Sequence, residues 1–211
     1  MTVVSLKTEK PRSDGVFKIK FSDGSSLLLT TDYLPETVLP DGEKNLHLWE
    51  LDRELSAGEE EAFRFAAACY RAEKISLGLV ARAEQNSLGL TAKLERRGFD
   101  SRVVKAVVSR LLERNLLNDS RYAELWIRSR LAMKKAPSPQ WLLIALGRRG
   151  IDRSSSLKAL GKVLDPETEY ALLLKYLEKI LFPEGKEVFS LRTQLKHEGF
   201  SSDALKRYFD D

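Results

Sequence analysis

The stretch Leu94-Glu95-Arg96-Arg97-Gly98-Phe99 returns twice more along this chain of 211 residues. The later copies are Leu146-Gly147-Arg148-Arg149-Gly150-Ile151 and Leu195-Lys196-His197-Glu198-Gly199-Phe200. Each copy reads leucine, three mostly polar residues, glycine, and a large apolar residue. This pattern is typical of a helix end: the leucine faces the core, the glycine takes the left-handed turn, and the last residue folds back onto the core.

The three glycines lie 52 and 49 positions apart, which leaves room for three helices in each unit. The stretch after each glycine again has apolar residues at helical spacing. We therefore predict a mainly α-helical protein of three tandem three-helix, helix-turn-helix-like repeats in an elongated body. The predicted repeats span residues 56–116, 117–164 and 165–211. Their starts carry helix-capping signals, at Ser56-Ala57-Gly58-Glu59, Asn118-Asp119 and Asp165-Pro166.

Residues 1–55 differ from the rest and predict a small β-meander. Val3–Leu6, Val16–Phe21 and Ser26–Thr30 have strand character, and Ser22-Asp23-Gly24-Ser25 is a hairpin turn. A sheet this small is not stable alone, so we expect it to pack as an accessory on the first repeat.

The formal net charge of +4 conceals a strong division along the chain. Residues 1–60 carry net −5, residues 61–163 carry net +12, and residues 164–211 carry net −3. A basic block between two acidic ends suggests a polyanionic partner for the middle of the chain. The alternative is that solvated helices are simply rich in arginine and lysine.

Composition excludes several other classes of protein. A single cysteine and two histidines leave no disulfide framework and no metal centre, and no apolar run is long enough to span a membrane. We expect a soluble cytoplasmic monomer without cofactor or metal. Glycine-rich phosphate loops and spaced acid pairs in apolar surroundings are missing from the sequence, so we predict that it is not an enzyme. Cys69 lies in a helical apolar run and reads as a packed thiol.

The basic doublets Arg96-Arg97 and Arg148-Arg149 occupy the same place in two repeats, at the last turn before the glycine. Cations there complement the helix dipole, but the third repeat has His197-Glu198 instead, so the doublet is not needed to end the helix. A binding role and a purely electrostatic role both remain open. By charge and position, the candidate binding residues are Arg96, Arg97, Arg121, Arg128, Lys134, Lys135, Arg148 and Arg149.

Two further features bear on what this surface contacts. Tyr122 and Trp126 fall on an apolar helical stripe and are interpreted as core residues rather than ligand-stacking ones. The third helices of the first two repeats begin with Asp100 and Asp152, which do not suit base readout in a DNA groove. Any nucleic-acid contact is therefore expected at backbone phosphates.

Taken together, these residues resemble the regulatory protein RecX family over most of residues 60–211. The resemblance rests on Leu90-Thr91-Ala92-Lys93-Leu94 after an arginine-containing helix end. It rests more specifically on Leu116-Leu117-Asn118-Asp119-Ser120-Arg121-Tyr122-Ala123, where the family has paired aspartates.

The resemblance implies a cytoplasmic modulator of the RecA recombinase. Such a protein binds the filament of RecA on single-stranded DNA and restrains its recombination, ATPase and coprotease activities. The alternative is a non-specific DNA-binding helical module that acts by occupying DNA, with double-stranded DNA left open as a further ligand.

Overall fold

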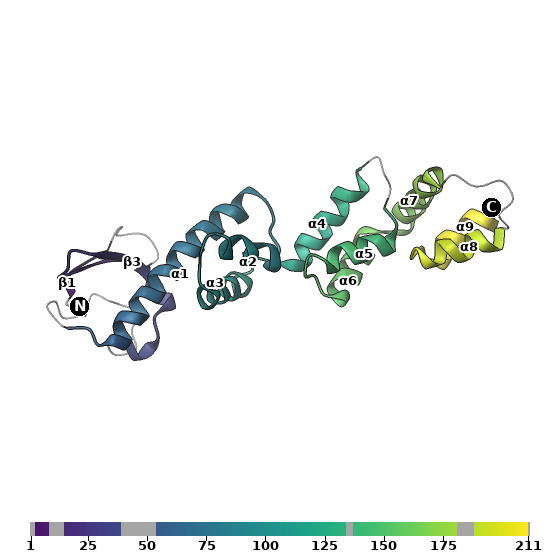
Figure 1. Ribbon diagram of the computed structural model, residues 1–211. Coiled ribbons are helices and arrows are strands. Elements are labelled where there is room, and N and C mark those ends of the chain that lie inside the picture. Colours follow the sequence, from purple (N-terminus) through teal and green to yellow (C-terminus); the bar gives the residue numbers. More distant parts are fainter. Residues whose placement is uncertain (1–2, 9–14, 39–53, 134–136, 181–187, 211) are drawn as a thin grey trace. The chain divides into compact units, whose positions relative to one another are not determined.

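A computed structural model describes residues 3–8, 15–38, 54–133, 137–180 and 188–210 (Figure 1). Within these ranges nine α-helices follow a three-stranded sheet and two short 3-10 helices. The predicted fold class, mainly helical with a small N-terminal β-meander, is confirmed. Two compact units divide the chain, one of residues 1–83 and 90–116 and the other of residues 84–89 and 117–211. The finer division into one extension and three repeats stays a prediction.

The N-terminal sheet is an antiparallel meander in the order β1-β2-β3, with β1 at Val3–Thr8, β2 at Val16–Phe21 and β3 at Ser26–Thr30. Alternate residues of β2 are buried, as expected for a strand with one face on a core. The 3-10 helices η1 (Thr31–Tyr33) and η2 (Glu36–Val38) follow. Both β3 and η1 pack against α1 (Ala57–Arg82), as expected for an accessory of the first repeat.

A buried carboxylate joins this accessory to the first helices. Glu73 of α1 is 7% exposed and accepts a 2.9 Å hydrogen bond from the Tyr33 hydroxyl. The guanidinium groups of Arg110 and Arg114 lie 3.6 and 3.5 Å from the same carboxylate, and Arg110 also pairs with Asp32. Because a buried charge is costly without partners, these contacts fix the position of η1 on the helices.

The first three helices are α1, α2 (Ser87–Glu95) and α3 (Ser101–Glu113). Ser56 and Glu59 form the predicted capping box at the start of α1. The helix continues through Gly78, because a single glycine costs a helix only about 1 kcal/mol. Cys69 is fully buried, which confirms the packed thiol.

Among the residues that the structure describes, the second unit holds the helices α4 to α9 and two hydrophobic cores. The first core lies among α4 (Asp119–Leu131), α5 (Pro139–Gly147) and α6 (Arg153–Val163). The second lies among α7 (Pro166–Lys179), α8 (Val188–His197) and α9 (Ser202–Asp210). Leu131 is half-buried and packs against both cores.

The three repeated glycines each take the left-handed conformation that the sequence predicted. Their φ angles are 80° at Gly98, 80° at Gly150 and 87° at Gly199. In each copy the residue after glycine donates a backbone hydrogen bond to the motif leucine, and the glycine donates to the residue after that leucine. These paired bonds form a Schellman motif, so the repeated stretch is a helix end in all three places.

Candidate cationic and aromatic surface

The nominated basic residues fall in different parts of the chain. Arg96 and Arg97 follow α2 in the first unit, whereas Arg121 and Arg128 lie on α4 of the second. Arg148 and Arg149 follow α5 in that same second unit. Lys134 and Lys135 lie outside the described residues.

Arg96 and Arg97 turn back onto their own helix. The Arg96 Nε donates to the carbonyl of Ala92 (3.2 Å), and an Arg97 guanidinium nitrogen donates to the carbonyl of Lys93 (2.7 Å). These bonds add side-chain donors to carbonyls in the last turn of α2, where the Ala92 carbonyl also accepts from the Arg96 amide, and both side chains stay exposed. The geometry is that of helix-end cations, and it leaves part of each guanidinium facing solvent.

Arg121 is held by the connection between α1 and α2. Its Nε lies 2.9 Å from Glu84 Oε1, and its other guanidinium nitrogen lies 2.7 Å from the same oxygen. This hydrogen-bonded pair raises the pKa of the arginine. Arg121 therefore ties the α1–α2 connection to α4.

The neighbouring residues complete this attachment. Asn118 caps α4 by accepting a 2.9 Å bond from the Arg121 amide. The Asp119 carboxylate reaches instead to Ser87 at the start of α2, accepting from its amide at 2.7 Å and from its hydroxyl at 2.5 Å. The stretch that carried the sequence resemblance thus holds Glu84 of the α1–α2 connection and Ser87 of α2 against the start of α4, within the second unit.

Arg149 covers a tryptophan of the core. Its guanidinium carbon lies 4.5 Å from the centre of the Trp126 ring, and one nitrogen donates to the carbonyl of Ala145 at 2.8 Å. Trp126 is 8% exposed and packs in the core of α4–α6, which confirms its interpretation as a core residue. A cation over an aromatic face is attracted by the negative face of the ring.

Trp141 and Arg130 join this arrangement, although neither was singled out from the sequence as a binding residue. The Trp141 ring stacks on Trp126 with centroids 6.1 Å apart and planes 18° apart. The Arg130 guanidinium lies 4.9 Å from the Trp126 ring. We call Trp126, Trp141, Arg130 and Arg149 the tryptophan–arginine cluster. The sequence does indicate that α5 exposes apolar side chains. Residues 141–146 are all apolar, and because they surround the helix they cannot all face one core.

Arg148 and Arg128 are the most open of the nominated arginines in this unit. Both are exposed, and Arg148 is the outward member of its doublet. Hydrogen bonds from Thr168 lower the pKa of Asp165 at the start of α7, and the positive charge of Arg128 lowers it further. Arg128 therefore lies within electrostatic reach of the next repeat.

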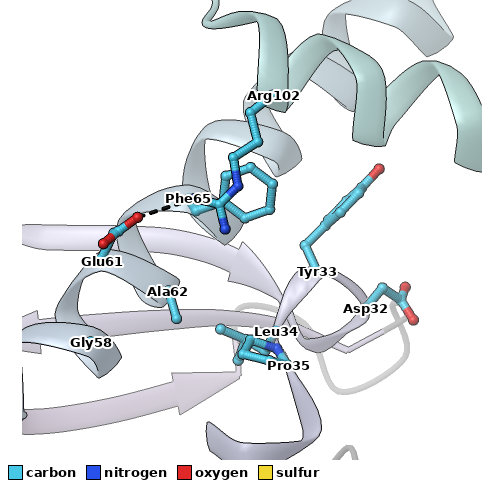
Figure 2. Close-up of a pocket in the computed structure, with 9 residues that line it drawn as sticks. All are labelled: Asp32, Tyr33, Leu34, Pro35, Gly58, Glu61, Ala62, Phe65 and Arg102. Atoms are coloured by element: carbon cyan, nitrogen blue, oxygen red, sulfur yellow. Dashed lines mark hydrogen bonds and ion pairs between the residues drawn. The ribbon is translucent and has the colours of Figure 1, made fainter.

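Other parts of the described chain offer weaker candidates for a site. A hollow of about 440 Å³ lies beside Tyr33 and the start of α1 (Figure 2). Among the described residues that line it, the cation is Arg102, which lies over the Phe65 ring at 4.6 Å and pairs with Glu61 at 3.1 Å. The Cys69 thiol is buried, which raises its pKa to about 12 and suppresses the reactive thiolate.

Metal-binding clusters and membrane-spanning helices are both absent from the described ranges. No group of three or more histidine, cysteine or acidic side chains is arranged to hold a metal ion there. No helix within those ranges is long and apolar enough to cross a membrane.

Fold and surface together define a helical-repeat protein with a small N-terminal sheet and a cationic, aromatic face. A regulatory protein RecX of Treponema pallidum (strain Nichols) is 36% identical over 143 residues, which cover 68% of this chain and 86% of that protein. The chain belongs to the regulatory protein RecX family. A second RecX, from Syntrophotalea carbinolica, is 31% identical over 146 residues, covering 64% of this chain and 92% of the relative.

Solved structures agree with the fold. A crystal structure of a regulatory protein RecX covers 100% of this chain and 99% of its own, with a TM-score of 0.68 at 19% identity. The structure of RecX from Lactobacillus salivarius covers 66% of this chain and 93% of its own, with a TM-score of 0.50 at 18% identity. No family-level sequence profile matches the chain.

Proposed function

We propose that this protein binds the filament of RecA recombinase on single-stranded DNA and restrains its recombination, ATPase and coprotease activities. The observation that carries the proposal is membership of the RecX family, whose members are named as regulatory proteins. The protein acts in the cytoplasm as a monomer, without catalysis or cofactor of its own.

The distribution of charge supports a partner of this kind. Residues 61–163 carry net +12, and this block includes the exposed Arg128 and Arg148. A recombinase filament offers two kinds of negative group to such a surface, the phosphates of the strand and the acidic side chains of the protein coat. Several repeats also supply several weak contacts to a periodic partner, and linked contacts strengthen one another through their effective concentration.

The test is the rate of ATP hydrolysis by a cognate RecA on single-stranded DNA, measured with increasing amounts of this protein at near-physiological salt. A regulator that restrains the filament lowers that rate at stoichiometric or lower ratios. An unchanged rate, together with an unchanged extent of strand exchange, contradicts the proposal.

The second candidate is a non-specific DNA-binding module, which the same net +12 block favours. Gel mobility of naked single-stranded DNA, run beside RecA-coated DNA, separates the two. Equal affinity for both forms indicates that DNA alone is bound. Clearly tighter binding to the coated strand indicates that the recombinase is part of the site.

A further inference from the structure

The outward face of α5 carries two large apolar side chains in the middle of the basic block. Trp141 is 49% exposed and Ile144 is 48% exposed. They lie three residues apart, and the exposed Arg148 follows four residues after Ile144, so all three lie along one side of the helix. We call Trp141, Ile144 and Arg148 the α5 face.

The other two repeats show that the fold does not need apolar residues here. Alignment on the three motif glycines places Gly89 and Ala92 at the first repeat's equivalents of Trp141 and Ile144. The third repeat has Ser190 and Thr193 at the same positions. Both of those helices still end in the same Schellman motif, so helix formation does not explain the exposed tryptophan and isoleucine.

Trp141 is also held in place before any partner arrives. One side of its ring stacks on Trp126, which is 8% exposed and lies beneath the guanidinium groups of Arg130 and Arg149. A side chain that is already ordered loses little conformational entropy on binding. The tryptophan–arginine cluster is therefore a rigid support for the α5 face.

The composition of the face fits a protein better than a nucleic acid. Tryptophan beside an aliphatic residue, with arginine at the edge, is typical of the few residues that dominate protein–protein affinity. Binding of a single strand uses successive aromatic rings and a row of cations along the backbone. Here Ile144 cannot stack on a base as a ring does, and Arg149 and Arg130 already lie over Trp126.

We propose that the α5 face docks a segment of the recombinase coat that presents an apolar side chain flanked by aspartate or glutamate. Its apolar residue covers Trp141 and Ile144, and its carboxylate pairs with Arg148. The cationic surroundings select the acidic flank through charge complementarity. This inference rests on the proposed function and identifies the part of the filament that is contacted.

The test uses a variant that copies the third repeat, Trp141→Ser with Ile144→Thr. Leu157→Ser is the matched control, because Leu157 of α6 is 46% exposed in the same repeat. Binding is measured to RecA assembled on single-stranded DNA with a non-hydrolysable ATP analogue, and separately to the naked strand. We expect the double variant to lose at least about tenfold in filament affinity, with naked-strand affinity changed less than about twofold. The Leu157→Ser control should bind as the wild type does.

Two results would overturn the inference. A parallel loss on naked DNA would show that the face is a base-stacking platform, and an unchanged filament affinity would show that it has no part in docking. If the wild type itself fails to bind the filament, the proposed function fails as well. If the wild type binds and the double variant binds equally well, only the inference about the α5 face fails. Arg148→Glu provides a second variant at an exposed position should the double variant fail to fold. It should weaken filament binding while circular dichroism stays unchanged, and wild-type affinity in this variant would contradict the proposed carboxylate contact.

Discussion

Gly150 and Leu88 approach each other so closely that a Cβ on the glycine would lie 2.8 Å from the Leu88 Cβ. Gly199 repeats the relationship one repeat later, where an added Cβ would lie 3.1 Å from the backbone nitrogen of Gln140. In both cases the glycine turn packs against the first residues of an earlier helix, α2 for Gly150 and α5 for Gly199, and all four residues belong to the second unit. Gly98 has the same φ of 80°, but a Cβ added there would meet nothing within 4 Å.

These three glycines allow conformational strain to be separated from repeat packing. Gly98→Ala should cost only the left-handed conformation, about 1 kcal/mol of unfolding free energy. Gly150→Ala should cost that amount and a further ~1–3 kcal/mol, because the Leu88 Cβ is fixed to its helix and cannot rotate away. Urea unfolding followed by circular dichroism measures both.

Gly199→Ala serves as the control for the packing contribution. Its contact is longer than that of Gly150, so its cost should fall between those of the other two variants. If all three Gly→Ala variants lose the same free energy of unfolding, the positive φ alone explains the glycines. Packing against the earlier helix then contributes nothing to the cost.

A second prediction concerns Arg121, which was nominated for binding and is found paired with Glu84. The two side chains are 40% and 21% exposed, so solvent screening limits the pair to about 0.2–1 kcal/mol of stability. Arg121→Gln should lower stability by that amount and leave filament affinity within about twofold of wild type.

Glu84→Gln is the matched partner in a double-mutant cycle. We expect it to cost about as much stability as Arg121→Gln, and the double variant to cost little more than either alone. If Arg121→Gln lowers filament affinity and Glu84→Gln does not, Arg121 itself contacts the filament, which would contradict this prediction.

A third prediction concerns alkaline stability of the first unit. Burial raises the pKa of Cys69 from 9.0 to about 12, and burial together with Glu73 raises the pKa of Tyr33 above its usual 10.0. Both groups stay protonated in the folded protein while the unfolded chain ionises. Stability is therefore fully present below pH 9 and falls above it, by up to about 1.4 kcal/mol per pH unit for each group.

Variants of the two groups check the assignment. Cys69→Ala should remove the part of the decline that begins near pH 9, and Tyr33→Phe the part that begins near pH 10. Tyr33→Phe should also lower stability at neutral pH, because Glu73 loses a buried donor. Urea unfolding from pH 7 to pH 11 gives the slopes, and slopes equal to that of the wild type would contradict the account.

Much of the fold follows from local chemistry that the sequence displays. The caps at Ser56, Asp100, Ser138 and Asp165 satisfy amides of their own helices, so a few neighbouring residues suffice to predict them. The motif glycines are predictable for the same reason, since the left-handed turn is a property of the residue itself.

Contacts between repeats depend on residues far away and were not predictable in the same way. Asn86 and Ser87 stand at the start of α2, where residues of these types usually cap their own helix. In the structure Asn86 donates to the carbonyl of Arg149, and Ser87 donates to Asp119. The partners lie 63 and 32 positions along the chain. Tertiary packing likewise decides which arginines lie over a ring or pair with a distant carboxylate. Charge and position alone therefore nominated Arg121 and Arg148 equally.

The last prediction separates the two members of the second doublet. Arg149 lies over Trp126 and donates to Ala145, so Arg149→Ala should lower stability, by about 0.5–2 kcal/mol for the lost cation–ring contact. Arg148 is exposed, so Arg148→Ala should leave stability within about 0.5 kcal/mol and act on binding instead. Thermal unfolding of the two single variants measures the first difference.

Salt dependence then shows what Arg148 contacts. If it meets a phosphate, Arg148→Ala should weaken binding to naked DNA and to the filament together, and should reduce the slope of log K against log salt by about 0.7 for a single strand. If it meets a carboxylate of the recombinase, filament binding should fall while the naked-DNA affinity and its slope hardly move. We expect the second outcome, because the α5 face joins this arginine to Trp141 and Ile144 rather than to a row of further cations. Unchanged binding to both partners by the folded variant would leave Arg148 as a helix-end charge alone.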